Sequence, residues 1–140
     1  MGIRDCLEKG LLKKSETSKD KIDSSLLISS DFLEKAKGNM KMRYYNIAFT
    51  LAYSSMFHAA RALLFSKGYT ERSHMCLVLF LKEEYKSSPE IHNLLEVLDA
   101  YRVSRHSVQY EGEYVSEVDA KEAIKDAGYF LDVATKELKK

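Results

Sequence analysis

Three basic side chains between residues 101 and 110, Arg102, Arg105 and His106, have the types and spacing to act on phosphate. Arg105 lies three positions and His106 four positions after Arg102, so in a helix all three project from one face. Arginine binds phosphate oxygens through paired N–H groups, and histidine transfers protons near neutral pH. The cluster predicts an RNA or nucleotide site, with His106 as general base for a ribose 2′-hydroxyl and both arginines stabilising charge on phosphorus.

The same cluster also has a purely structural interpretation. In that interpretation the arginines pair with acidic side chains on neighbouring helices, and His106 is a solvated polar residue. The apolar stripe formed by Leu94, Leu98 and Tyr101 brings position 105 to or beside the helix seam, where a cation needs a partner. Both interpretations predict that Arg105 has an anionic neighbour.

Motifs for several other chemistries are absent. The chain has no H-E-x-x-H, no Walker loop, no G-x-S-x-G and no Rossmann glycine pattern. Its four histidines include His92, and none is spaced from another histidine, a cysteine or a carboxylate as metal ligands usually are. We therefore expect no catalytic metal and no cofactor.

Apolar and small residues recur every three or four positions, which predicts that helices hold this cluster in place. We expect helices over residues 19–38, 43–67, 73–85, 88–110 and 116–138. Ser88, Pro89 and Glu90 together are typical of a helix start, as serine caps, proline takes the first helical position and glutamate favours the first turn. Ser116 and Asp119 approximate a capping box.

Short connections between long helices make antiparallel neighbours the default. We predict an all-α fold, an up-and-down four-helix bundle that residues 1–140 form as a single domain. Ile3, Leu7 and Leu11 predict a short additional N-terminal helix. The alternating runs typical of strands are short and do not support a sheet.

Composition limits the compartment and the partners. A formal net charge of +1 provides no global attraction for polyanions, so nucleic acid would need a local basic patch. Cys6 and Cys76 lie far apart in no recognised pair spacing, so we expect a reducing compartment with Cys76 as a small buried hydrophobe. Because no apolar run reaches a membrane span and the start lacks a signal-peptide core, we expect a cytoplasmic protein without membrane contact.

The run A-Y-S-S-M-F-H-A-A-R-A-L-L-F-S-K-G at residues 52–68 resembles the second helix of HEPN proteins, the higher eukaryote and prokaryote nucleotide-binding domains. The resemblance continues through Arg72-Ser73-His74, the arginine-rich residues 102–112 and the helix start at residues 115–117, and it covers roughly residues 5–137. It implies a helical bundle, often a homodimer, with the arginine-bearing helices near the dimer axis.

The resemblance implies two kinds of activity. Some members are metal-independent ribonucleases with an arginine followed after four to six residues by histidine, and others only bind. Here three residues separate Arg102 from His106, whereas four separate Arg105 from Tyr110. We predict a nucleic-acid- or nucleotide-associated module, the partner of a minimal nucleotidyltransferase in a toxin–antitoxin-like pair. The alternative is a metal-independent endoribonuclease that uses the arginine and histidine cluster.

Four further residues are candidates for binding RNA or a nucleotide. His58 and Arg61 lie in the best-matched segment, and His74 matches a family histidine at a helix start. His58 also has a structural interpretation, as a histidine hydrogen-bonded within the bundle. Tyr110 can orient the site or stack on a base, and it is the tyrosine that we would examine for modification by a nucleotidyltransferase.

Overall fold

Serine side chains begin most of the long helices in the computed structural model, which describes residues 1–140. Ser18, Ser73, Ser88 and Ser116 each accept a hydrogen bond from the backbone N–H three residues later, which satisfies a donor that the first turn would leave free. The helices that they begin are α2 Lys19–Lys41, α4 His74–Glu84, α5 Pro89–Glu111 and α6 Glu117–Leu138. The starts predicted at residues 88 and 116 are therefore confirmed.

The remaining helices and the helix ends follow local backbone chemistry. The short helix α1 spans Ile3–Glu8, and α3 spans Tyr45–Ser66 without a side-chain cap. Gly112 ends α5 in the left-handed conformation at φ 70°, as glycine does at little cost. The prediction that the first long helix ends at residue 38 is wrong, because α2 continues to Lys41 and the chain turns at Arg43, with φ 63°.

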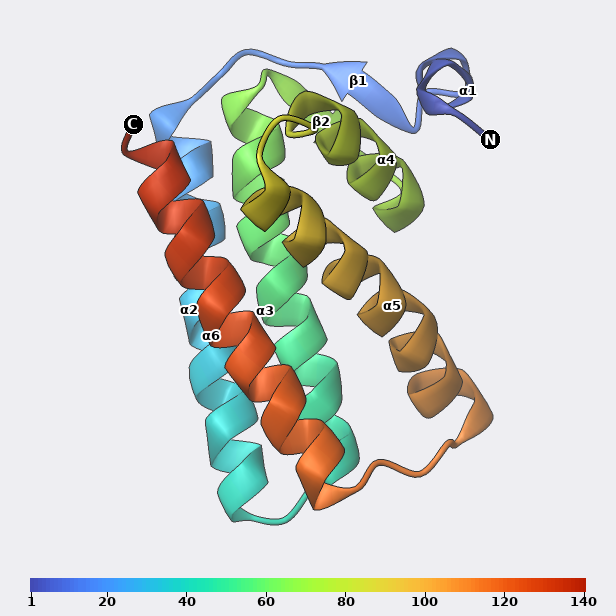
Figure 1. The fold of residues 1–140 in the computed structure, drawn as a ribbon, viewed down its shortest axis with the longest axis vertical. Helices are drawn as coiled ribbons and strands as arrows, with labels where there is room; N and C mark the ends of the chain where they lie inside the picture. The colour runs from blue at the N-terminus through green and yellow to red at the C-terminus, as the bar shows by residue number, and fades with distance from the viewer.

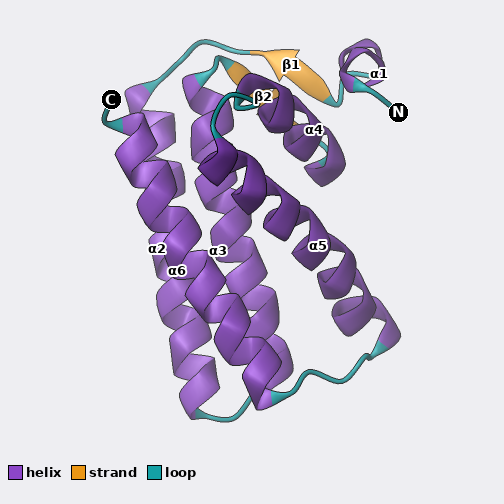
Figure 2. Cartoon of the chain, in the orientation of Figure 1, coloured by secondary structure: helices purple, strands orange, loops and turns teal.

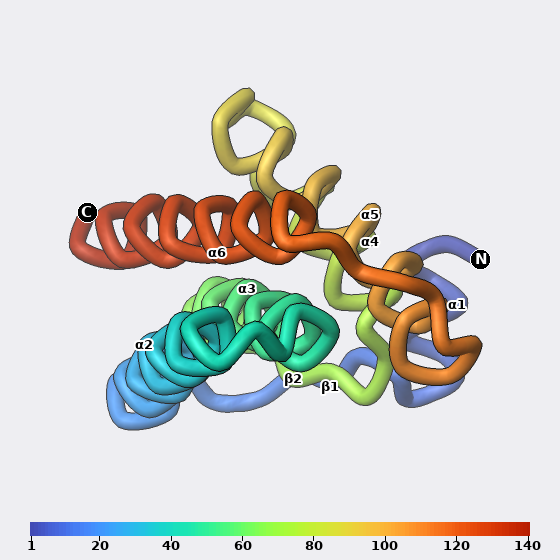
Figure 3. The backbone as a smooth tube through the Cα atoms, turned by 90° about the horizontal axis from the view of Figure 1, so that it is seen from below, coloured from blue at the N-terminus to red at the C-terminus, as the bar shows by residue number.

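The chain is 76% helical, and the all-α prediction is confirmed (Figure 2). The short N-terminal helix is also present, but it ends at Glu8 and does not include Leu11. Helices α2, α3 and α6 lie side by side along the long axis, whereas α5 slants away from them toward its C-terminal end (Figures 1 and 3). An extended segment then brings the chain back to the start of α6. None of the helices combines the length and the apolar character needed to cross a bilayer.

The centre of the fold is α3, where more than half of the residues are buried. Small side chains at Ala52, Ser55 and Ala59 are fully buried and allow a close approach of α2 and α6. Ser55 Oγ donates to the Ser29 carbonyl oxygen at 2.8 Å, and Ser29 Oγ donates to the Ser55 carbonyl oxygen at 2.7 Å. This reciprocal pair satisfies two buried hydroxyls at the α2–α3 contact.

Two short strands, which the sequence did not predict, form an antiparallel pair. Strand β1 at Leu12–Lys14 pairs with β2 at Tyr69–Glu71, with Leu12 opposite Glu71. Each strand has only three residues, too few for a recognisable alternation. Their stability comes from pairing across the fold, so local sequence pattern could not reveal them.

The expectation of two separate thiols is wrong, because Cys6 and Cys76 form a disulfide with Cα atoms 5.9 Å apart. Both residues are fully buried, so the predicted burial of Cys76 is confirmed. The two cysteines are 70 positions apart in the chain, and only the packing of α1 against α4 brings them together. Their spacing therefore gives no support for a reducing compartment.

Enlarging a small residue on α3 should destabilise the bundle. We expect Ala59→Leu to lower the free energy of unfolding by about 1–3 kcal/mol, because the added atoms meet a filled core. The matched control is Ala100→Leu at an exposed helical position on α5, expected to change stability by less than about 0.5 kcal/mol. Urea unfolding followed by circular dichroism measures both, and equal stabilities would contradict close packing around α3.

Candidate functional site

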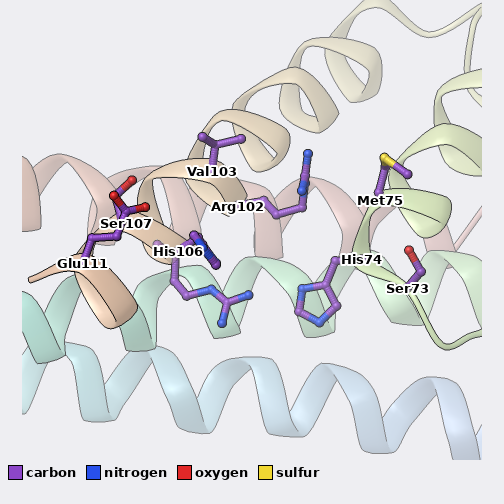
Figure 4. A pocket seen from close by; sticks show the side chains of 9 residues that line it. Ser73, His74, Met75, Arg102, Val103, His106, Ser107 and Glu111 are labelled. Carbon is purple, nitrogen blue, oxygen red and sulfur yellow. The ribbon is translucent and has the colours of Figure 1, made fainter. Parts of the chain in front are cut away.

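A cleft of about 490 Å³ lies between the start of α4 and the C-terminal half of α5. Figure 4 shows Arg102, His106 and Glu111 of α5 on one side, and on the other side His74 at the start of α4 and its N-cap residue Ser73. Arg105 also lines the cleft. The structure thus brings together the three predicted catalytic candidates and one of the four predicted binding residues.

Arg102 has an acidic partner on its own helix. Its Nε donates to Asp99 Oδ1 at 2.9 Å, one helical turn earlier. The structural interpretation expected a partner on a neighbouring helix, and this is wrong for Arg102. The pair holds the guanidinium through Nε, while its terminal amino groups make no hydrogen bond within the chain. A fork held in this way remains able to bind phosphate.

Arg105 has no acidic partner. Its guanidinium carbon lies 5.0 Å from the centroid of the Tyr53 ring, and Nη1 donates to Gln109 Oε1 at 3.0 Å. Its Nε is buried without a hydrogen-bond partner. The aromatic face and the amide offset only part of the cost of partial burial. Both sequence interpretations expected an anionic neighbour at Arg105, and the protein itself supplies none.

His74 is held in a defined orientation by α3. Its Nδ1 lies 2.7 Å from Tyr53 Oη, and its ring stacks on Phe57 with centroids 3.8 Å apart. Burial, followed by the nearby charge of Arg105, lowers the pKa of His74 to about 4, and burial raises the pKa of Tyr53 to about 12. A protonated phenol that donates to Nδ1 leaves the neutral imidazole with its proton on Nε2, as a hydrogen-bond donor.

His106 lies at the cleft, and Tyr110 lies beside it, four positions later on α5. Both side chains are exposed, and their ring centroids are 5.0 Å apart with the planes tilted by 46°. His106 lines the cleft but makes no hydrogen bond or ion pair that would hold its ring. Tyr110 does not line the cleft and reaches it only through its contact with His106.

The other two predicted residues line a neighbouring pocket of about 320 Å³ between α3 and α5, here called the α3 pocket. Arg61 Nε lies 2.7 Å from Glu71 Oε1, an ion pair too poorly aligned for a hydrogen bond. His58 stacks on Phe32, its Nδ1 is buried without a partner, and burial lowers its pKa. The expectation of a histidine hydrogen-bonded within the bundle is therefore wrong for His58.

The cleft and the α3 pocket meet at two residues, since His74 and Arg105 line both. Sequence analysis singled out neither Tyr53, which orients His74, nor Gln109, which accepts from Arg105. The four-residue spacing between Arg105 and Gln109 is a helical neighbour signal that could have revealed the second contact. No such signal exists for Tyr53 and His74, which are 21 positions apart.

No group of three or more histidine, cysteine, aspartate or glutamate side chains is placed so that it could hold a metal ion. What the arrangement offers is two guanidinium groups, a neutral imidazole and one exposed histidine around a single cleft. Such groups can bind an anion and stabilise negative charge.

The lowered pKa of His74 predicts a pH dependence of stability. Below the ordinary value of 6.5 the unfolded chain takes up a proton at His74, whereas the folded chain does so only near pH 4. The stability due to neutral His74 is therefore full above about pH 6.5 and is lost as the pH falls toward 4. Urea unfolding of wild type and His74→Gln should give a stability difference that changes across this window. A constant difference would contradict the prediction.

Comparison with known protein families gives a match to the HEPN domain over residues 22–138. The matched span begins within α2, ends at the last residue of α6 and includes every residue that lines the cleft and the α3 pocket. No curated protein matches the chain. The family match covers most of the chain and agrees with the resemblance found at residues 52–68, which lie mainly on α3. This protein therefore belongs to the HEPN domain family.

Proposed function

We propose that this protein binds the phosphate groups of RNA or of a nucleotide in the cleft between α4 and α5. We further propose that it is the partner of a minimal nucleotidyltransferase in a toxin–antitoxin-like pair. Membership of the HEPN family supports a nucleotide- or RNA-associated module in general. The single observation that carries the choice of site is the unpaired charge of Arg105.

A partly buried guanidinium without a carboxylate is costly, because burial removes water that no anion replaces. Arg105 is in this state, and Glu111 is the only acidic residue that lines the cleft. A bound phosphate would supply the missing anion and accept from Arg102 on the same helical face. The neutral His74 adds a donor without adding charge, so the cleft suits a phosphodiester or monoester oxygen.

Metal-independent RNA cleavage remains the alternative function, because Arg102, Arg105 and His106 line one cleft. In that reaction His106 takes the proton of a 2′-hydroxyl, whose oxygen attacks the adjacent phosphorus. The bond to the 5′ oxygen breaks, that oxygen gains a proton, and a 2′,3′-cyclic phosphate remains. His74 with a pKa of about 4 is a poor base at neutral pH, and His106 has no partner that holds it. These two points favour binding over cleavage.

Oligomeric state and partner can be tested together. Tyr110 is 65% exposed beside His106 and is the tyrosine that we propose a nucleotidyltransferase modifies. Light scattering of the chain alone should give a homodimer, twice 16.1 kDa. With a nucleoside triphosphate, a nucleotidyltransferase should transfer one nucleoside monophosphate to the Tyr110 hydroxyl oxygen and release pyrophosphate. Mass spectrometry should detect one such addition on the wild type and none on Tyr110→Phe. A monomer that the enzyme leaves unmodified would refute both parts.

Removal of either cleft arginine should weaken RNA binding. We expect Arg105→Gln and Arg102→Gln each to reduce retention of single-stranded RNA on a filter about tenfold or more, since a hydrogen bond to a charged group contributes about 1.5–3 kcal/mol. Lys125→Gln on the exposed side of α6 removes the same charge outside both pockets and should leave retention unchanged.

The same incubation in EDTA separates binding from cleavage. Intact RNA at stoichiometric protein supports the binding module. Products with 2′,3′-cyclic phosphate ends that disappear in a folded His106→Ala variant would instead establish the ribonuclease. Equal retention by wild type and both arginine variants would refute phosphate binding in the cleft.

A further inference from the structure

We propose that the α3 pocket is a second phosphate subsite, so that the ligand is a strand with at least two successive phosphates rather than a mononucleotide. This inference rests on the proposed function, because the first phosphate occupies the cleft. The two sites share a wall formed by His74 and Arg105. The guanidinium of Arg105 thus faces both the cleft and the α3 pocket, and phosphates bound in the two sites would both contact it.

The lining of the α3 pocket suits an anion. No aspartate or glutamate lines it, whereas Arg61 and Arg105 do. Ser54 contributes a hydroxyl, and Gln109 contributes an amide whose oxygen already accepts from Arg105. The NH₂ group of that amide is therefore available to donate. Two cations and two neutral donors, with no carboxylate in the lining itself, form an environment for phosphate.

Arg61 is held in place from outside the pocket. Glu71, which does not line the pocket, pairs with Arg61 through Nε and has only 7% of its side chain exposed. The guanidinium carbon lies 5.9 Å from the Phe57 ring centroid and 5.3 Å from that of Phe65. Contacts on these sides restrain the guanidinium, while its terminal amino groups make no hydrogen bond within the chain. Such restraint lowers the entropic cost of binding an anion.

The ligand part that enters the α3 pocket is backbone rather than base. Stacking of a base needs an accessible aromatic face. Tyr53 and Phe57 line the pocket but are only 2% and 7% exposed, and His74 and Arg105 lie against their rings. Burial lowers the pKa of His58 and so favours the neutral form, which can hydrogen-bond a ribose hydroxyl without adding charge. Phosphate and ribose therefore fit this lining better than a base.

The test compares the affinity of a ligand that has one phosphate with that of a ligand that has two. Competition anisotropy in EDTA would measure the affinity of adenosine 5′-monophosphate and of a 5′-phosphorylated diadenylate with a 2′-O-methyl group that blocks cleavage. We expect the diadenylate to bind wild type about tenfold tighter, from one further charge-assisted contact. A plot of log Kd against log salt concentration should be steeper for the diadenylate than for the monophosphate by about 0.7. This is the difference that one further phosphate contact makes on a single strand.

Arg61→Gln should bring the ratio of the two affinities close to one and remove the extra salt dependence. Glu71→Gln is the matched control, since it breaks the same ion pair but keeps the arginine and its contacts with the Phe57 and Phe65 rings. It should lower the ratio less than Arg61→Gln does and leave it clearly above one. Thermal unfolding of both variants confirms that they are folded. Loss of the ratio in both variants would give Arg61 a structural role only and overturn the second subsite.

A ratio near one in wild type would also overturn the second subsite. In that outcome, weaker mononucleotide binding by Arg102→Gln would still leave the proposed function intact. If neither ligand binds, the proposed function fails and the second subsite fails with it.

Discussion

The burial of α3 is the constraint on which the rest of the structure depends. Small residues such as Ala52 and Ala59 allow α2 and α6 to approach closely, and the reciprocal serine pair satisfies the polar groups trapped there. The side of α3 that bears Tyr53, Phe57 and Arg61 is then left for α4, α5 and β2. One helix thus forms both the core and the wall of the site, which ties the geometry of the cleft to the stability of the bundle.

Electrostatic effects at the site follow from that burial. The hydrogen bond between Tyr53 and His74 joins α3 to the first residue of α4. Burial, followed by the charge of Arg105, lowers the pKa of His74 to about 4 and keeps the imidazole neutral. A neutral donor adds no charge repulsion to the two arginines, and no carboxylate pairs with Arg105. The arrangement at Arg105 is therefore locally unfavourable, as arrangements at functional sites often are.

The N-terminal segment is joined to the same region by a strand pair and by the disulfide. Strand β1 pairs with β2, the segment that supplies Glu71 to Arg61, and the disulfide joins α1 to α4 two residues after His74. Both connections hold the chain that runs between Arg61 and His74. They restrict how far the start of α4 can move from α3, and a precise site requires that kind of support.

The sequence by itself determined the features that depend on neighbours within about four residues. The Ser88 cap with Pro89 and the capping box at Ser116 were both readable, because a cap involves only one helical turn. The shared helical face of Arg102, Arg105 and His106 followed from the same periodicity. The long run of small and aromatic residues at positions 52–68, mainly on α3, also identified the family.

Tertiary structure alone decided which groups meet across the fold. The disulfide, the strand pair and the contact of Tyr53 with His74 each join residues that are far apart in the chain. The same holds for Arg61 with Glu71, whereas Arg105 was left without the partner that its place on the helix had led us to expect. Such contacts depend on how whole helices pack, and the periodicity of one helix contains no information about the side chains of another.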